Sequence, residues 1–270
     1  MILIFDTSDG LVNQFYDFFN GINFCLKHNI NFTFRYCSFR KDDLTHFDPK
    51  PIDLLFDLKF LNKYKLYIDY NKIKEKVSNE NCYNYSNRYI SSQILKSEKI
   101  LEQLVNFKKD YVILPKFWCI YGFRNIIDYD IFKFINPCNM LVKKYQEIKD
   151  KLIGNTKYNF IHYRYEKDFI NYFKLSVDSL ESLIKKITFK DNSLKIFIAT
   201  SNIKNLIDLK DPKFKNLIYK NDDELSDLNF EQRAFIDYMF GLNSVECYGH
   251  SKSSFSSMIN KIKNTNNYYD

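Results

Sequence analysis

Four ionisable residues alternate along one short stretch of the 270-residue sequence: His162, Arg164, Glu166 and Asp168. Residues two apart share one face of a strand, so a strand over 160–165 would project His162 and Arg164 together, with both carboxylates near its end. Arginine binds phosphate oxygens in a bidentate manner, and a carboxylate can accept a proton from an attacking hydroxyl. The stretch indicates either a site that neutralises a leaving diphosphate or a structural arginine–carboxylate ion pair.

A second polar stretch, DGLVNQ at 9–14, separates an apolar run at 2–5 from a helical pattern that starts at Leu11. Gly10 would allow a ligand to approach the backbone closely. The helix start would offer free N–H groups and a positive dipole end to an anion. Asn13 lies in its first turn. The alternative is an ordinary strand–helix turn with a capping Asn or Asp.

A third stretch, GHSKSSFSS at 249–257, lies between a predicted strand and the last predicted helix. Hydroxyls of Ser253 and Ser254, together with the helix N–H groups, could form a cradle for phosphate. Phe255 could stack on a base. The alternative is a serine helix cap followed by a core phenylalanine.

Several common motifs are absent. The sequence has no G-x-G-x-x-G, no Walker A loop and no G-x-S-x-G, which argues against a dinucleotide oxidoreductase. The six cysteines include no C-x-x-C pair, so their spacing does not support a metal site. Free thiols in a reducing compartment are expected.

The composition suits a packed protein that binds an anion. The formal net charge is +7, with 45% hydrophobic and 18% aromatic residues. Charges of both signs are interspersed, so no nucleic-acid binding is predicted. No stretch reaches the length of a membrane span, and the start of the chain lacks the pattern of a signal peptide. We expect a soluble, cytoplasmic protein.

Strands and helices alternate along both halves of the chain. The first half opens with a predicted strand, helix and strand, which favours a parallel sheet. The second half repeats strand, turn and helix in the manner of a Rossmann-like fold. Its predicted strands cover 158–165, 194–199, 217–219 and 245–248, and its predicted helices cover 177–187, 230–242 and 255–262. The polar segment around Gly154 separates the halves and predicts two domains, 1–154 and 155–270.

Together, the three stretches resemble motifs of the GDP-fucose-dependent fucosyltransferases, especially the protein O-fucosyltransferase-like group. Members of that group have G-G-L-N-N-Q or G-R-F-G-N-Q after the first strand. A middle strand carries H-x-R, followed in plant-type members by Y-E-K-D. A helix with an internal Asp, a strand and G-N-x-x-S-S-F come near the end. This sequence has DGLVNQ, HYRYEKD and FIDYMFGLNSVECYGHSKSSFS in the same order.

The resemblance implies an α/β GT-B architecture, in which two Rossmann-like domains with parallel sheets face a central cleft. The acceptor would occupy the N-terminal domain and the nucleotide-sugar donor the C-terminal domain. The implied activity is inverting and needs neither metal nor cofactor. It would move L-fucose from GDP-fucose to a hydroxyl of a glycan or protein acceptor.

The resemblance also implies roles for the donor-side residues. Arg164 would contact the diphosphate, and His162 would lie beside the nucleotide. Ser253, Ser254 and Phe255 would hold the phosphate and the base. Asp237, the Asp inside the last long helix, would lie near the guanosine or brace the loop.

Gly10 and Asn13 would line the cleft from the other domain. We expect Glu166, in preference to Asp168, to be the catalytic base because it is nearer the strand end. Asp6, Asp9 and a reaction without a protein base remain alternatives.

The sequence departs from the family pattern at three positions. Gly10 occupies the position of the arginine in G-R-F-G-N-Q, and His250 that of the Asn in G-N. Ser201 occupies the position of an Asp that often follows the A-T after the predicted strand over 194–199. A transferase for another nucleotide sugar, an inactive nucleotide-sugar-binding protein and a phosphate-binding domain with unrelated chemistry are therefore kept as alternatives. The intact set of Arg164 and the two following carboxylates favours an enzyme.

Overall fold

The computed structural model describes residues 1–40, 47–85, 97–117, 135–176, 178–200, 203, 206–208 and 211–270. The chain divides into two compact units. Unit 1 comprises Met1–Asn139 with Asn229–Glu231, and unit 2 comprises Met140–Leu228 with Gln232–Asp270. The division lies one helix earlier than the predicted boundary at 154. Helix α4 (Asn139–Leu152) falls almost entirely in unit 2, where Tyr145 packs edge-on against Phe240 with ring centroids 4.8 Å apart.

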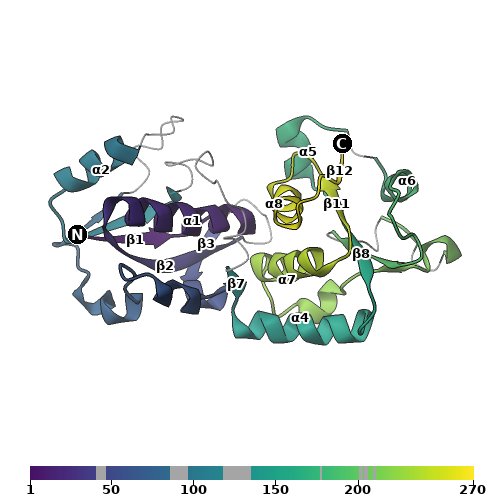
Figure 1. The fold of residues 1–270 in the computed structure, drawn as a ribbon, viewed down its shortest axis with the longest axis horizontal. Coiled ribbons are helices and arrows are strands. Elements are labelled where there is room, and N and C mark those ends of the chain that lie inside the picture. The colour runs from purple at the N-terminus through teal and green to yellow at the C-terminus, as the bar shows by residue number, and fades with distance from the viewer. Residues whose placement is uncertain are drawn as a thin grey trace. The chain divides into compact units, whose positions relative to one another are not determined.

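Unit 1 is built on a mostly parallel sheet in the order β3-β2-β1-β6-β5. Strand β1 pairs in parallel with β2 and β6, and β5 with β6, whereas β3 runs antiparallel to β2. Helix α1 lies along this sheet (Figure 1). The elements are β1 (Ile2–Asp6), α1 (Leu11–His28), β2 (Asn31–Arg40), β3 (Phe47–Pro51), β5 (Cys82–Asn84), α2 (Ser97–Asn106) and β6 (Tyr111–Pro115), with a separate antiparallel pair β4 (Phe56–Asp57) and β7 (Asn136–Pro137).

Aromatic rings fill the space between α1 and the sheet. Phe18 of α1 packs on Phe34 of β2 at 4.3 Å, and Phe34 packs on Phe5 of β1 at 5.4 Å. All three rings are fully buried. The helix ends where the sequence predicted, because Asn29 adopts the left-handed conformation (φ 53°) that closes a helix. The core of unit 1 therefore fixes the end of β1 and the loop that follows it.

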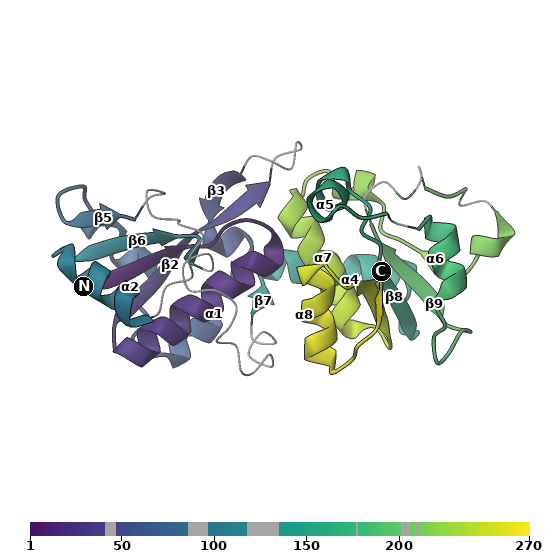
Figure 2. The same ribbon diagram turned by 90° about the horizontal axis from the view of Figure 1, so that it is seen from above.

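Unit 2 is built on a fully parallel sheet in the order β10-β9-β8-β11-β12. Figure 2 shows α8 beside α7 and α4. The alternation of strands and helices predicted for this half is confirmed. The elements are β8 (Tyr158–His162), α5 (Lys167–Phe173), α6 (Leu180–Lys186), β9 (Lys195–Ala199), β10 (Leu217–Ile218), α7 (Phe230–Asn243), β11 (Cys247–His250), α8 (Ser254–Lys263) and β12 (Tyr268–Tyr269).

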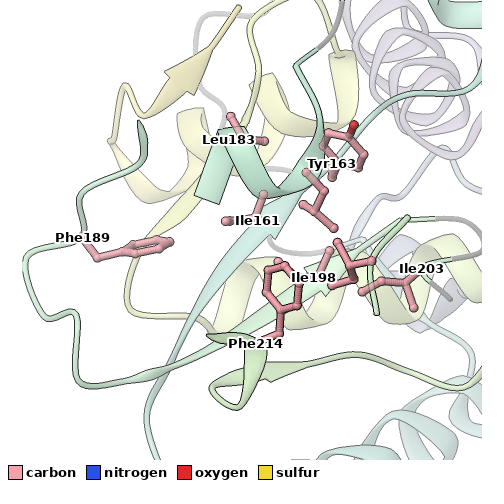
Figure 3. Close-up of a cluster of buried hydrophobic side chains, with 9 residues drawn as sticks. Ile161, Tyr163, Leu183, Phe189, Ile198, Ile203 and Phe214 are labelled. Carbon is pink, nitrogen blue, oxygen red and sulfur yellow. The ribbon is translucent and has the colours of Figure 1, made fainter. Parts of the chain in front are cut away.

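The two faces of this second sheet bury different side chains. On one face, Ile161 of β8 and Ile198 of β9 pack with Leu183 of α6 in an apolar cluster (Figure 3). On the other, Phe197 stacks on Phe240 of α7 at 4.1 Å. Residues two apart in a strand point to the same face of the sheet. His162 therefore lies on the same face as Phe160, which is the face covered by α7 and α8.

Among the described residues, no helix is long and apolar enough to cross a membrane. The α/β class with two Rossmann-like units is confirmed by these mostly parallel sheets. In such sheets, ligands bind beyond the carboxyl ends of the strands. We therefore describe the groups that lie at those ends, one unit at a time.

Candidate functional site

Strand β8 ends at His162, earlier than the predicted end at Tyr165. The N–H of Tyr163 still donates to the carbonyl of Ala199 at 2.9 Å. The next N–H, that of Arg164, instead donates to the side-chain hydroxyl of Tyr269 at 3.1 Å, so the strand ladder cannot continue. The expectation of a strand over 160–165 with Arg164 in it is therefore wrong. Arg164 lies in the turn between β8 and α5.

His162 is held by the first turn of α8. Its Nδ1 lies 2.8 Å from Ser256 Oγ, and its ring packs on Phe255 with centroids 4.4 Å apart. Burial lowers the pKa of His162 to about 3, with smaller contributions from the positive charges of Arg164 and Lys220. The imidazole is consequently neutral near pH 7 and can act there as a hydrogen-bonding group, not as a cation or a general acid.

Arg164 and Glu166 form an ion pair, with Arg164 Nε 2.9 Å from Glu166 Oε2. Both side chains are about four-fifths buried, with 21% and 17% of their areas exposed. The guanidinium also lies over the ring of Phe169 in α5, 5.0 Å from its centroid. The ion pair that the sequence left as an alternative is present. It orients the guanidinium through Nε, and a guanidinium has further N–H groups with which to bind an anion.

Asp168 lies on α5, and its side chain is outside the described residues. Ser201 is also outside them. The role of Asp168 as a second carboxylate therefore stays a prediction.

The 253–255 segment forms the start of α8. Ser253 is buried, and its N–H donates to the carbonyl of His250 at 3.0 Å. Ser254 is exposed. Phe255 is buried between His162 and Tyr238, whose ring lies 5.6 Å away. Phe255 is thus a core residue, as in the alternative to base stacking. The serines and the first N–H groups of α8 lie at the end of the sheet.

Ser256 is a site residue that sequence reasoning missed. It is fully buried between His162 and strand β11. A methyl group at Gly249 would overlap both Oγ and Cβ of Ser256. Glycine is therefore required at position 249 for α8 to approach β11 closely enough for Ser256 to reach His162. A glycine in the last strand followed by a serine-rich helix start is the signal that could have identified this contact.

Lys220 is a second residue that sequence reasoning missed. It follows β10 at the same end of the sheet and forms a buried ion pair with Asp237 of α7, with Nζ 2.5 Å from Oδ2. Its charge is among the causes of the lowered His162 pKa. Asp237 thus pairs with the segment after β10, and the roles that the resemblance implied for it, near the guanosine or bracing the loop, stay predictions. A lysine directly after a short strand was the available signal.

His250 ends β11 where the resembling family has an asparagine. Its Nδ1 accepts a hydrogen bond from the N–H of Lys252 at 3.1 Å, which assigns the proton of the neutral ring to Nε2. Nε2 is buried and has no hydrogen-bond partner among the described residues. Burial lowers the pKa of His250, the Asp270 charge opposes this and the Lys252 charge adds to it.

In unit 1, the loop after β1 is fixed by Gln14, which is fully buried in α1. Its amide nitrogen donates to the carbonyls of Asp9 and Ser38 at 3.0 and 2.9 Å, and its amide oxygen accepts from the Thr7 hydroxyl at 2.8 Å. Asn13 is half-buried on the same turn of the helix. Hydrogen bonds from one buried side chain therefore hold the polar loop against α1 and β2.

The left-handed residue of this loop is Asp9 (φ 66°), not Gly10. Gly10 has φ −65°, which any residue can adopt, and a methyl group there would meet the guanidinium of Arg40 at 3.5 Å, an ordinary contact distance. The backbone conformation therefore does not require glycine at position 10. Both carboxylates that were alternatives for the base are ion-paired, Asp6 with Arg35 at 2.6 Å and Asp9 with Lys116 at 3.1 Å.

The carboxyl ends of β8 and β11 thus collect His162, Arg164, Glu166 and the start of α8 within unit 2. Gly10 and Asn13 lie in the loop of unit 1. Within the described ranges, no three His, Cys, Asp or Glu side chains cluster in a way that could hold a metal ion. The unit 2 arrangement offers a cation, helix N–H groups and a neutral histidine, which together can bind an anionic diphosphate.

Comparison with solved structures identifies the fold. A structure of POFUT1 in complex with GDP matches with a TM-score of 0.71 at 10% sequence identity, covering 99% of this chain and 98% of that chain. The chain shares the fold of GT-B fucosyltransferases. NodZ α-1,6-fucosyltransferase soaked with GDP-fucose matches with a TM-score of 0.60 at 12% identity, over 97% and 92% of the two chains. Fucosyltransferase NodZ from Bradyrhizobium matches with a TM-score of 0.56 at 9% identity, over 96% and 92%.

No protein-family model and no curated protein matches the sequence. The GT-B prediction, which rested on three short motifs, is confirmed at the level of the fold. At about one-tenth identity, the likeness does not transfer a substrate or a residue's role. Those belong to the chemistry of the site.

Proposed function

We propose that this protein is a fucosyltransferase-like glycosyltransferase that moves L-fucose from GDP-fucose to a hydroxyl of a glycan or protein acceptor. The observation that carries the proposal is the grouping of Arg164, His162 and the start of α8 at one end of the unit 2 sheet. The likeness to folds solved with GDP and with GDP-fucose supports the donor. Unit 1, with Gly10 and Asn13, is proposed as the acceptor side.

The proposed chemistry breaks the bond between the sugar C1 and the diphosphate oxygen. The electron pair leaves with GDP, whose developing charge must be neutralised. Arg164 supplies a positive charge, and the N–H groups at the start of α8 supply donors and the positive end of a helix dipole. Because these groups are fixed before the reaction, we propose that the transfer needs no metal. Turnover should survive EDTA, and strict metal dependence would overturn this part.

The acceptor hydroxyl attacks C1 from the opposite side, which inverts the configuration, and its proton passes to a base. Glu166 is our proposed base, with Asp168 as the alternative. The ion pair gives Glu166 a second task, because it holds Arg164 Nε at 2.9 Å. Asp6, whose carboxylate accepts two hydrogen bonds from Arg35, and Asp9, which pairs with Lys116, are the further alternatives.

Thermal shifts with GDP, UDP, ADP and CDP test the donor class. A ligand at a hundred times its Kd adds about 2.7 kcal/mol of stability, so GDP should raise Tm the most. Arg164→Ala should weaken GDP binding and strongly reduce this shift, and it should lower turnover by about a hundred- to a thousandfold. Lys195→Ala is the matched control, since Lys195 is an exposed cation at the opposite end of the same sheet.

His250 favours a second candidate, a transferase for another nucleotide sugar. It carries a buried N–H where the resembling family has an asparagine. A larger shift with UDP or CDP would support that candidate. GDP binding without turnover on any acceptor would instead support an inactive nucleotide-sugar-binding protein. Full turnover by Arg164→Ala would overturn the mechanism.

A further inference from the structure

We propose that Tyr269 is a positioning residue for Arg164, and that its hydroxyl sets where the arginine leaves strand β8. This inference rests on the proposed function, in which Arg164 binds the diphosphate of the donor. Tyr269 belongs to β12, more than a hundred residues after β8. It is not part of the sequence motifs described above.

One side-chain hydroxyl bridges two main-chain groups on either side of Tyr163. The Tyr269 hydroxyl donates to the carbonyl of His162 at 2.7 Å and accepts from the N–H of Arg164 at 3.1 Å. β12 pairs with β11, with Tyr269 opposite His250. The side chain therefore reaches past β11 to the end of β8. A phenol can donate and accept at the same time, so this one group satisfies both backbone groups where the strand ends.

The hydroxyl stays protonated over the working range of a protein. Burial raises the pKa of Tyr269 above its usual value, so its hydrogen bond to His162 does not depend on pH near neutrality. The ring is held by the apolar cluster beneath it and lies 5.5 Å from the His250 ring. The Tyr269 ring is thus held in place, and its hydroxyl fixes the position of the Arg164 backbone.

The effect on Arg164 follows from what else holds that residue. Its guanidinium contacts Glu166 and Phe169, which both come after it in the chain. His162, which comes before it, is tied to α8 through Ser256. The Tyr269 hydroxyl fixes the backbone between these two groups. Without it, the guanidinium and its partners can shift relative to His162 and the start of α8.

Tyr269→Phe removes only the hydroxyl and is the test variant. Tyr248→Phe is a matched control, because the Tyr248 hydroxyl also donates to a backbone carbonyl, that of Thr188 at 3.1 Å. Both rings pack against the same apolar cluster. A purely structural role would let Tyr269→Phe lower the stability of the fold while GDP affinity and donor kinetics stay at the values of Tyr248→Phe.

The measurements are GDP affinity, kcat and KM for the donor, and hydrogen exchange of the Arg164 amide. We expect Tyr269→Phe to lose roughly ten- to a hundredfold in kcat/KM, to bind GDP more weakly and to exchange the Arg164 amide faster. Tyr248→Phe should match the wild type. In an Arg164→Ala background, Tyr269→Phe should have no further effect on GDP binding.

The outcomes separate the two proposals. A wild-type protein that does not bind GDP overturns the proposed function, and this inference with it. A wild-type protein that binds GDP while Tyr269→Phe behaves like Tyr248→Phe overturns only the role of Tyr269. An equal loss of GDP affinity with and without Arg164 does the same, because it would mean that the hydroxyl acts on the fold and not through the arginine.

Discussion

Glu166 contacts Arg164 in the turn after β8, so its charge bears on both donor binding and proton transfer. Glu166→Gln separates these tasks because it removes the charge and keeps the shape. GDP affinity should stay the same or rise, since Arg164 is no longer neutralised by its neighbour. The value of kcat should fall by about a hundredfold or more if Glu166 is the base. Steady-state kinetics and calorimetric GDP titration measure the two effects.

Asp168→Asn is the comparison for that experiment. If Glu166→Gln retains full kcat and Asp168→Asn does not, the base is Asp168. If neither carboxamide variant slows the reaction, the transfer proceeds without either carboxylate as its base.

The neutral state of His162 predicts a pH dependence of stability. The folded pKa is about 3 and the ordinary value is 6.5, so between these values the unfolded chain binds a proton that the folded protein does not. His162 therefore contributes stability that is fully present above pH 6.5 and is lost as the pH falls toward 3. The free energy of unfolding should fall by up to about 1.4 kcal/mol per pH unit in this window.

The measurement is urea unfolding of the wild type and of His162→Gln at several values from pH 4 to pH 7. The free energy of unfolding should depend more steeply on pH in the wild type than in His162→Gln, by the effect of this one proton. His28→Gln is the control: burial also lowers the His28 pKa, but that residue lies on α1 in unit 1. Equal slopes for the wild type and His162→Gln would mean that His162 is not held neutral.

At the scale of the elements, the contact between β11 and α8 depends on Gly249. Gly249→Ala should force α8 away, because a methyl group there overlaps Ser256. Overpacking of this kind costs about 1–3 kcal/mol. The same shift would separate Ser256 from His162, so GDP binding should weaken as well. Chemical denaturation and GDP titration measure the two losses.

Gly10→Ala is the matched substitution in the other loop. Its backbone conformation suits alanine, and the nearest side-chain atom would lie 3.5 Å away. We expect no loss of stability and a slight gain, because alanine restricts the unfolded chain. If Gly10→Ala destabilised the protein as much as Gly249→Ala, the close approach of α8 would not be the cause.

The periodicity of apolar residues predicted most elements correctly because the same residues form the buried faces. The helix from Leu11 to Asn29 and the alternation in unit 2 are examples. The end of β8 could not be predicted this way. It is set by the hydroxyl of Tyr269, a contact between residues far apart in the chain, and local pattern carries no information about such a partner.

The candidate site was predictable in part for the same reason. Arg164 and His162 stand in a recognisable spacing, and their type suggests phosphate binding. Ser256 and Lys220 act through packing and charge across the sheet. Only the register of β8 beside β11, with His162 opposite Gly249, brings Ser256 to the histidine.

For the whole molecule, the proposed donor groups all belong to unit 2, although the chain divides into two units of similar construction. His162, Arg164 and the start of α8 come from strands β8 and β11 and the segments that follow them. The polar loop of unit 1 is instead fixed internally by Gln14 and by the Asp9–Lys116 pair. A bound donor should accordingly change backbone hydrogen exchange mainly in unit 2.

Hydrogen exchange with and without GDP tests this division. Because a bound diphosphate would accept hydrogen bonds from the start of α8 and order the turn after β8, exchange should slow in residues 158–166 and 247–257. Residues 2–6 and 31–40 form β1 and β2 of unit 1 and should show little change. The Arg164→Ala variant at the same GDP concentration is the control and should show much less slowing. Slowing that was equal in both units would contradict the assignment of the donor to unit 2, because those unit 1 strands contain none of the groups proposed to bind it.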